Sequence, residues 1–406
     1  MVGASLAGHA SARALRDLGF TGRITIVGGE EHRPYDRPPL SKDFLAGTAV
    51  ASDLWLEGEN EDLDADWRLG AMAASLDPAT RTVMLADGRT VTSDAVVIST
   101  GSFAKTFPQL PAGVHTLRTL DDAIGLRAEL TPGTRLVVVG SGFIGLEVAA
   151  TARGLGVDVT VLGTTGNPLS RAFGTAVGEA VQGIQERHGV RIRNNTRVEA
   201  VLGQGGTGGR VTGVRLISGE IIDADVVVLG IGSIAATDWL EDSGIELGSG
   251  VVCSEVGETS APGIFAVGDC SAWFDPVRGT HHRIEHWSDS RDRPAIAMAA
   301  LLSIDAPAKA LRPSYLWSDQ AGSRIQFAGR LLGGETVDVE AGTAEGGDLL
   351  VVYRRGDEPV AVVGINQPKL VAAWRKRLTA PAIARPAIAR SATSASEPSE
   401  PAVSIA

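Results

Sequence analysis

Short runs of β-branched and other apolar residues recur along the chain, each bounded by glycine or polar residues. Runs of this length and composition predict strands. Between them we expect helices, one at about residues 9–18 and another that opens at Leu146. This alternation predicts an α/β fold. The expected strands are Ile24–Val27, Thr134–Val139, Val157–Leu162, Ile264–Val267, Leu349–Tyr353 and Val360–Ile365.

The turn at residues 140–145 carries the most specific chemical signal. The strand Thr134–Val139 runs directly into a complete GxGxxG, made by Gly140, Gly142 and Gly145 with Ile144 between them, and a helix follows. Strand, glycine turn and helix in this order predict a dinucleotide site, because the backbone can approach a pyrophosphate at the helix N-terminus. A glycine-rich hairpin, the alternative, does not explain the helical stretch.

The strand after this turn ends at Gly163, a position where an acid commonly binds the ribose of NAD. No arginine stands beside it to bind the 2′-phosphate of NADPH. Gly163 therefore predicts weak discrimination between the two coenzymes.

An incomplete version of the turn stands at the start of the chain, with Gly3, Ser5 and Gly8 in the glycine positions. This spacing alone is a weak indication, because glycine-rich chains produce it by chance. The strand Ile24–Val27 strengthens it, since Glu30 follows about twenty residues past the turn, where a carboxylate accepts a ribose hydroxyl.

Only Met1 and Val2 precede this first turn, although a dinucleotide turn normally follows a buried strand of several residues. We expect most of that strand to be missing and its neighbours to lose ladder hydrogen bonds and buried apolar area. Either the native start lies upstream of Met1 or the chain is an impaired relative.

Two dinucleotide turns in one chain imply two nucleotides held face to face. FAD on the first turn and a nicotinamide dinucleotide on the second is the economical arrangement. A third segment, in which Gly268 and Asp269 follow a strand, supports it, although Asp269 alone could equally cap the next helix.

A series of motifs, in one order from residue 3 to about residue 377, connects these turns: GASLAG, YDRPPLSK (35–42), STG (99–101), LRTLDDA (117–123), GSGFIGLEVAA, GIG (230–232), FAVGDC, RIEHW (283–287) and LWSDQAGSRIQFAG (316–329). With them the chain resembles the FAD-dependent NAD(P)H:ferredoxin reductases, the family of putidaredoxin reductase and of the reductase components of aromatic-ring dioxygenases. The resemblance implies a glutathione-reductase-like flavoprotein fold, with two Rossmann-like domains and a smaller α+β C-terminal domain.

The order of the motifs predicts the domain boundaries. An FAD-binding domain is expected at 1–112 and 236–306, an NAD(P)-binding domain at 113–235, and a C-terminal interface domain at 307–380. Residues 381–406 are rich in Ser, Ala, Pro and Glu and are expected to be disordered.

The resemblance also implies roles for individual residues. Lys42 would lie beside the flavin N5 and pair with Glu147, so both would act as catalytic residues during hydride transfer. A solvated loop lysine and a glutamate that complements the helix dipole are the respective alternatives. The other implied cofactor-binding residues are Ala7, Glu30, Arg37, Ala73, Thr100, Gly101, Arg118, Gly232, Gly268, Asp269, Trp287 and Trp317; no metal is expected.

Trp287 and Trp317 would also line a path by which single electrons reach an iron–sulfur protein, with core packing as the equal alternative. Near them, residues 288–294 (SDSRDRP) depart from the family pattern. Because Pro294 cannot donate a backbone hydrogen bond, we expect a helix to begin at or just before it.

Cysteine usage separates the reaction classes. Cys253 and Cys270 are the two cysteines of the chain, and they form no C-x-x-C or C-x4-C pair. A redox disulfide is therefore not expected, and both thiols are predicted to be structural. Electrons must then leave the flavin directly for an external acceptor.

Composition agrees with an enzyme of two or three domains, since 44% of the 406 residues are apolar. No apolar run reaches the ~18 residues that span a bilayer, so the cytoplasm is the expected location. The net charge of −11 argues against nucleic-acid binding and, taken over the whole chain, against docking an acidic ferredoxin. A docking patch must be local, and Arg375-Lys376-Arg377 is the densest basic cluster, unless it is only a solvated helix end.

We therefore expect a monomeric or weakly dimeric oxidoreductase that uses FAD and NADH, with NADPH possible. Its partner would be a [2Fe–2S] ferredoxin or a rubredoxin that serves a cytochrome P450 or a ring-hydroxylating oxygenase. The alternatives are an NADH oxidase or diaphorase that reduces oxygen or quinones, and a degenerate, non-catalytic paralogue.

Overall fold

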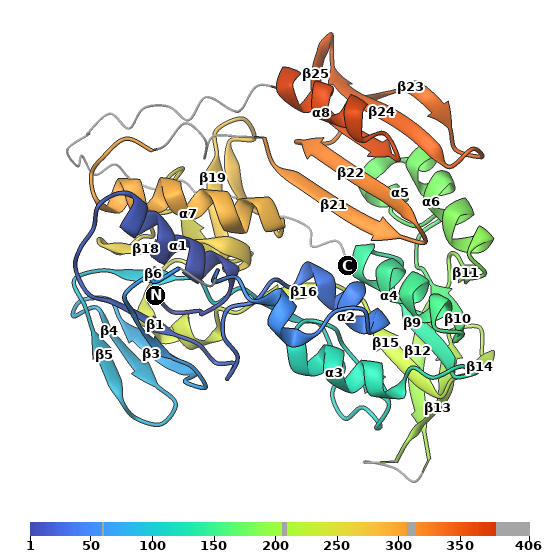
Figure 1. Ribbon diagram of the computed structural model, residues 1–406, viewed down its shortest axis with the longest axis horizontal. Coiled ribbons are helices and arrows are strands. Elements are labelled where there is room, and N and C mark those ends of the chain that lie inside the picture. The colour runs from blue at the N-terminus through green and yellow to red at the C-terminus, as the bar shows by residue number, and fades with distance from the viewer. Residues whose placement is uncertain (59–60, 205–208, 307–312, 379–406) are drawn as a thin grey trace.

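The computed structural model describes residues 1–58, 61–204, 209–306 and 313–378, which form three units (Figure 1). The first unit contains the elements at 6–104 and 238–301, the second those at 114–235, and the third those at 315–377. The tail predicted to be disordered, 381–406, lies outside the described residues.

Parallel strand pairs covered by helices form the centre of the first unit. Strand β1 (Ile24–Val27) pairs with β2 (Ala65–Arg68), and β6 (Val96–Ile98) pairs with β18 (Ile264–Ala266). Helix α1 (Leu6–Asp17), rich in alanine, lies against α7 (Trp287–Leu301), as small side chains allow (Figure 1). The other elements are η1 (Pro38–Ser41), α2 (Asp43–Ala46), η2 (Ala51–Leu54), β3 (Ala73–Asp77), β4 (Thr82–Leu85), β5 (Thr90–Thr92), β7 (Ser102–Ala104), η3 (Asp238–Ser243), β17 (Val251–Cys253), η4 (Gly268–Cys270), β19 (Ser271–Asp275) and β20 (Thr280–Arg283).

One residue, Val2, joins the two strand pairs. It forms parallel bridges to Val27 on one side and to Ile98 on the other. Its N–H donates to Val97 O at 2.8 Å, and its carbonyl accepts from Ser99 N at 2.7 Å. Val2 therefore pairs on both edges as a single extended residue. Among the described residues no strand lies between β1 and β6, so the expected loss of ladder hydrogen bonds along the rest of these two strands stays a prediction.

The second unit is built on a five-stranded parallel sheet in the order β11-β10-β9-β15-β8. Its central strands are nearly continuous apolar runs, as expected for a sheet covered on both faces. The elements are β8 (Val114–His115), α3 (Leu120–Glu129), β9 (Arg135–Val139), α4 (Phe143–Gly154), β10 (Asp158–Leu162), α5 (Ser170–Phe173), α6 (Thr175–Arg187), β11 (Arg191–Arg193), β12 (Val198–Gly203), β13 (Val211–Leu216), β14 (Ile221–Asp223), β15 (Val226–Leu229) and β16 (Ser233–Ala235). The last of these, β16, pairs with β7 of the first unit and so joins the two units.

The third unit is a five-stranded antiparallel sheet, and its order β21-β22-β25-β24-β23 places the predicted strands of this region, β24 and β25, side by side. Val371 and Trp374 of the last helix are buried against one face. On the other side, β21 contacts α4 and β24 contacts α6 of the second unit (Figure 1). The elements are β21 (Tyr315–Gln320), β22 (Ser323–Gly329), β23 (Thr336–Thr343), β24 (Asp348–Arg355), β25 (Glu358–Ile365) and α8 (Pro368–Arg377).

Three helices start earlier than the sequence predicts, and the helix expected to open at Leu146 is α4, which begins at Phe143. Helix α1 begins at Leu6, and α7 begins at Trp287, so Pro294 lies inside it and the prediction that the helix starts there is wrong. Side-chain hydrogen bonds hold the turn before the proline, since Ser288 Oγ donates to Tyr315 O at 2.7 Å and Ser290 Oγ donates to Asp269 Oδ1 at 3.1 Å. None of the helices in the described part of the chain has the length and apolarity to cross a membrane.

Candidate active site

A cavity of about 680 Å³ lies where the three units meet. Its walls come from the N-terminus of α1, the η1–α2 segment, the start of α4, the segment from β20 to α7, and strands β21 and β22. More than half of the predicted site residues line it: Ser5, Ala7, Arg37, Lys42, Thr100, Gly101, Arg118, Ile144, Glu147, Asp269, Trp287 and Trp317.

The remaining predicted residues do not form the cavity wall. Most are glycines, which shape the chain rather than offer a side chain. Glu30 adjoins the cavity residue Arg37, and its Oε1 accepts a hydrogen bond from Arg37 Nη2 at 2.6 Å. Ala73 pairs with Leu85 in the β3–β4 hairpin. The full set is Gly3, Gly8, Glu30, Ala73, Gly140, Gly142, Gly145, Gly163, Gly232 and Gly268.

The first glycine turn requires glycine at two of its positions. Gly3 has φ +119°, and a Cβ there would lie 2.1 Å from Ser99 O. A Cβ on Gly8 would lie 1.9 Å from Gly3 O, so the helix can approach the turn only with glycine at this place. Ser5, in the position of the second glycine, has extended backbone, which any residue adopts.

The second turn repeats this geometry. Gly140 has φ +115°, and a Cβ there would lie 2.1 Å from Gly230 O; a Cβ on Gly145 would lie 2.4 Å from Gly140 O. A Cβ on Gly142 meets nothing within 4 Å. Nothing in the folded chain therefore demands glycine at position 142, and the space beside it is open.

The two helices that follow these turns offer their N-termini to an anion. The N-cap residues, Ser5 for α1 and Gly142 for α4, make no side-chain capping bond, and no acidic residue lies in either first turn of the described structure. Their first N–H groups are thus available to a phosphate. Arg37 and Arg118 add positive charge to the same cavity. The donor set fits the pyrophosphate of a dinucleotide.

Lys42 and Glu147 are brought together from different units. Lys42 Nζ donates to Glu147 Oε2 at 2.7 Å, and Glu147 is only 5% exposed. Two hydroxyls also donate hydrogen bonds to this carboxylate. Ser41 Oγ donates to Oε2 and Ser318 Oγ donates to Oε1, each at 2.5 Å. Lys42 is therefore not a freely solvated loop lysine. The Glu147 carboxylate is buried and accepts hydrogen bonds from three side chains.

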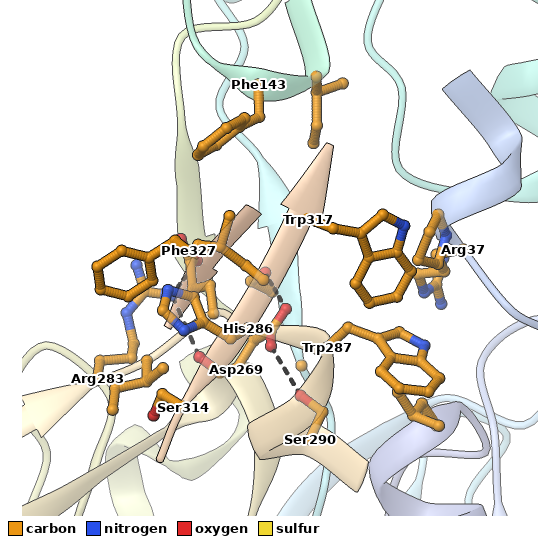
Figure 2. A pocket seen from close by; sticks show the side chains of 18 of the residues that line it. Arg37, Phe143, Asp269, Arg283, His286, Trp287, Ser290, Ser314, Trp317 and Phe327 are labelled. Atoms are coloured by element: carbon orange, nitrogen blue, oxygen red, sulfur yellow. Dashed lines mark hydrogen bonds and ion pairs between the residues drawn. The ribbon is translucent and has the colours of Figure 1, made fainter. Parts of the chain in front are cut away.

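Asp269 lies in η4 at the centre of the cavity (Figure 2). Its Oδ2 accepts from Arg118 Nη2 at 2.7 Å, and its Oδ1 accepts from Ser290 Oγ at 3.1 Å. The next α-helix, α7, has His286 as its N-cap. Asp269 therefore does not cap it, and its carboxylate faces the cavity between an arginine and a hydroxyl.

Two indole rings form one wall of the cavity. Figure 2 shows Trp287 and Trp317 side by side, and their rings meet edge to face with centroids 5.3 Å apart. Trp287 Nε1 donates to Asp36 Oδ1 at 2.5 Å. Burial raises the pKa of Asp36 above its ordinary value, and the bond to Trp287 and the charge of Lys42 oppose that shift.

Sequence reasoning missed several residues that line the cavity or contact the side chains of its wall. Phe143, Phe173 and Phe327 form an aromatic group, with ring centroids 5.9 Å apart for Phe143 and Phe173 and 5.4 Å apart for Phe173 and Phe327. Figure 2 shows Phe143 and Phe327 on the side away from the two indoles. Asp36 stands inside the YDRPPLSK motif and could have been noticed there. Phe173 and Ser318 have no local signal, because their place depends on how the units pack.

Neither cysteine lies at the cavity. Cys253 and Cys270 are both buried and free, and burial raises the pKa of each thiol. Their sulfurs contact backbone carbonyls of Val251 and Val267 at 3.2 and 3.3 Å. The prediction that they are structural agrees with these contacts, since reactive thiols need a low pKa and exposure.

Comparison with known proteins shows the family. A family model described as pyridine nucleotide-disulphide oxidoreductase matches residues 1–293, and one described as reductase C-terminal matches residues 315–395. The chain is 37% identical over 376 residues to the biphenyl dioxygenase system ferredoxin–NAD(+) reductase component of Paraburkholderia xenovorans (strain LB400), covering 90% of this chain and 89% of that protein. It is 36% identical over 394 residues to the chlorobenzene dioxygenase ferredoxin reductase component of Cupriavidus sp. (strain PS12), covering 95% of this chain and 93% of that protein.

Solved structures agree with this relationship. The covalent putidaredoxin reductase–putidaredoxin complex contains a chain that superposes with a TM-score of 0.88 at 31% identity, covering 93% of this chain and 92% of that one. This chain therefore belongs to the pyridine nucleotide-disulphide oxidoreductase family and, within it, to the ferredoxin–NAD(+) reductases, which are oxidoreductases that use NADH and FAD.

Proposed function

We propose that NADH reduces FAD in the cavity at the junction of the three units and that electrons leave this cavity singly for an iron–sulfur ferredoxin. One observation carries the proposal: the Lys42–Glu147 pair and the Trp287–Trp317 wall, which suit the two halves of this reaction, border the same cavity.

The residues of the first unit suit the binding of FAD. The uncapped N-terminus of α1 and the arginines Arg37 and Arg118 would neutralise its pyrophosphate. Glu30 would accept a ribose hydroxyl, and Asp269 would bond the ribityl chain from the centre of the cavity. Bound FAD supplies the ability to accept two electrons as a hydride and to release them one at a time.

The second turn suits the nicotinamide coenzyme. The open space at Gly142 allows the backbone to approach a pyrophosphate at the N-terminus of α4. Gly163 provides neither an acid for the ribose nor a cation for a 2′-phosphate. We therefore propose NADH as the preferred coenzyme, with only weak rejection of NADPH.

Lys42 and Glu147 suit the hydride step. The Lys42 ammonium would stabilise the negative charge that develops as the hydride is accepted, because a fixed cation in a site shielded from water interacts strongly with developing charge. Glu147 would hold that ammonium in place, since its carboxylate is anchored by Ser41 and Ser318.

The aromatic residues suit the exit of electrons. The Tyr315 ring stacks on the Trp317 ring, with centroids 6.1 Å apart, and the Arg375 guanidinium lies over the Tyr315 ring. The cavity wall is thus continuous with the basic cluster, defined as Arg375, Lys376 and Arg377 at the end of α8. We propose that an acidic [2Fe–2S] ferredoxin or a rubredoxin docks at this cluster. The cytoplasmic location and the monomeric or weakly dimeric state remain predictions.

Single-turnover mixing tests this function against its alternatives. The purified FAD-loaded protein is reduced with one equivalent of NADH without oxygen, and the reduced protein is then mixed separately with a [2Fe–2S] ferredoxin, a rubredoxin, oxygen and a quinone. We expect fast bleaching of the flavin and reoxidation fastest by one of the iron–sulfur proteins. Faster reoxidation by oxygen or the quinone would support an oxidase or diaphorase, and a protein that binds no flavin would support the non-catalytic paralogue.

A further inference from the structure

A chain of buried hydrogen bonds leads from the second unit through the third unit to Glu147. Gln185 Nε2 on α6 donates to Gln320 Oε1 at 2.9 Å, and Gln320 Nε2 donates to Ser318 Oγ at 2.8 Å. Ser318 Oγ donates to Glu147 Oε1 at 2.5 Å. Gln185, Ser318 and Gln320 are each at most 2% exposed, so water does not compete for these bonds.

The types of donor and acceptor atoms fix the direction of these hydrogen bonds. The amide nitrogen of Gln320 can only donate, so the Ser318 hydroxyl accepts from it and must direct its single proton to Glu147. Gln185 Nε2 also donates to Leu146 O at 3.1 Å, next to Glu147 in α4. This series of hydrogen bonds therefore contacts α4, the helix that carries Glu147, and also fixes the Oε1 atom of the Glu147 carboxylate.

The two oxygens of Glu147 have separate tasks. Oε2 accepts from Lys42 and Ser41 of the first unit, whereas Ser318 is the one donor to Oε1 among the described residues. If Ser318 lost its hydroxyl, Oε1 would be buried without a partner, which is costly for a charged group. Rotation of the carboxylate toward Lys42 would relieve that cost and draw the ammonium away from the cavity.

We propose that Ser318 is a positioning residue for hydride transfer, which sets the position of the Lys42 ammonium through Glu147 Oε1; this rests on the role of Lys42 in the proposed function. The adjacent residue on β21, Trp317, lines the cavity, while Ser318 is fully buried behind it. One strand of the third unit thus supports both the entry of the hydride and the exit of the electrons.

The test uses Ser318→Ala in the FAD-loaded protein. Flavin reduction by NADH in single-turnover mixing should slow about tenfold, as expected when one hydrogen bond to a charged group is lost. In a Glu147→Gln background the same substitution should have no further effect, because coupled residues are not additive. Ser318→Thr, which keeps the hydroxyl, should restore the rate, and Ser323→Ala, which removes a hydroxyl from the same β21–β22 hairpin without contact to Glu147, should leave the rate unchanged.

A second measurement does not depend on turnover. Competitive acetylation, read by mass spectrometry, gives the reactivity of Lys42 relative to the exposed Lys369 of the same oxidised protein. Ser318→Ala should lower this ratio at least threefold, since both carboxylate oxygens then hold the ammonium. An unchanged or increased ratio, or equal slowing by Ser318→Ala with and without Glu147, would overturn the proposal.

Two further variants keep the outcomes separate. If Ser318→Ala does not fold, Ser318→Cys keeps the side chain near its size but replaces the hydroxyl with a thiol, which is only a weak donor to Glu147 Oε1. Reduction at the wild-type rate in that variant would contradict the positioning role. If Lys42→Met itself reduces at the wild-type rate, the proposed role of Lys42 fails; if Lys42→Met is slow and Ser318→Ala is not, only the present inference fails.

Discussion

The guanidinium of Arg375 lies 4.5 Å from the centre of the Tyr315 ring. This contact joins the basic cluster on α8 to the line of rings that runs through Trp317 to Trp287. The basic cluster and the tryptophans are separate features in the sequence, each with an ordinary structural alternative. In the folded chain they form one continuous surface, so a partner bound to the cluster would lie at the end of the aromatic line.

Replacement of Trp317 tests this exit path. Trp317→Leu removes the ring between Trp287 and Tyr315, so electron transfer from the reduced flavin to a ferredoxin should slow at least about tenfold, while flavin reduction by NADH stays near the wild-type rate. Both steps are followed by flavin absorbance in stopped flow. Trp239→Leu, outside the cavity, is the matched control; equal ferredoxin rates in the two variants would exclude Trp317 from the path.

Charge reversal tests the docking site. Arg375→Glu, Lys376→Glu and Arg377→Glu together should weaken ferredoxin turnover most at low ionic strength, because salt already screens exposed charges when it is high. The triple reversal Arg23→Glu, Arg33→Glu and Arg89→Glu, at exposed positions of the first unit, is the control for net charge. If both triple variants show the same salt dependence, the partner docks elsewhere.

Removal of the Lys42 ammonium tests the hydride step. Lys42→Met should slow flavin reduction by NADH about tenfold or more, since the developing negative charge loses its neighbouring cation. The effect is measured in single-turnover mixing at saturating NADH. Lys369→Met, which removes an exposed ammonium from α8, should not change this step. A wild-type rate for Lys42→Met would show that the ammonium does not act in reduction.

Substitution of Gly163 tests coenzyme choice. Gly163 does not have a positive φ, and a Cβ there would lie 2.7 Å from Ser141 Oγ, a flexible hydroxyl that can turn away, and 3.2 Å from Ser141 Cβ, which must shift by a few tenths of an ångström. Gly163→Glu should therefore be accepted and raise the preference for NADH over NADPH up to about tenfold, through a ribose hydrogen bond of about 1 kcal/mol. Gly163→Gln adds similar bulk without charge. Equal ratios of kcat/KM in both variants would show that position 163 does not face the ribose.

Two of the three glycines of the second turn, Gly140 and Gly142, should respond differently to alanine. Gly140→Ala forces a positive φ and a contact with Gly230 O, so the free energy of unfolding should fall by at least about 2 kcal/mol. Gly142→Ala meets nothing in the folded chain and should leave the stability unchanged while raising KM for NADH. Chemical denaturation and steady-state kinetics separate the two effects. An unchanged KM for Gly142→Ala would contradict close approach of the coenzyme.

Local sequence determined the elements and the two turns. Strand, glycine turn and helix are adjacent in the chain, so the turn at Gly140 could be predicted from the sequence, and the predicted strands recur as β1, β9, β10, β18, β24 and β25. The start of α7 could not be predicted, because the turn before Pro294 is held by Asp269 and Tyr315, which are distant in sequence.

Tertiary structure decided how the site residues meet. Only the family resemblance predicted that Lys42 pairs with Glu147. The packing of η1 against α4 brings Lys42 Nζ to 2.7 Å from Glu147 Oε2. Ser318 and Phe173 carry no local sign of their contacts, because a hydrogen bond or ring contact across units depends on the approach of whole elements. The sequence thus specified which backbone can receive a nucleotide, whereas the packing of the three units specified which side chains surround it.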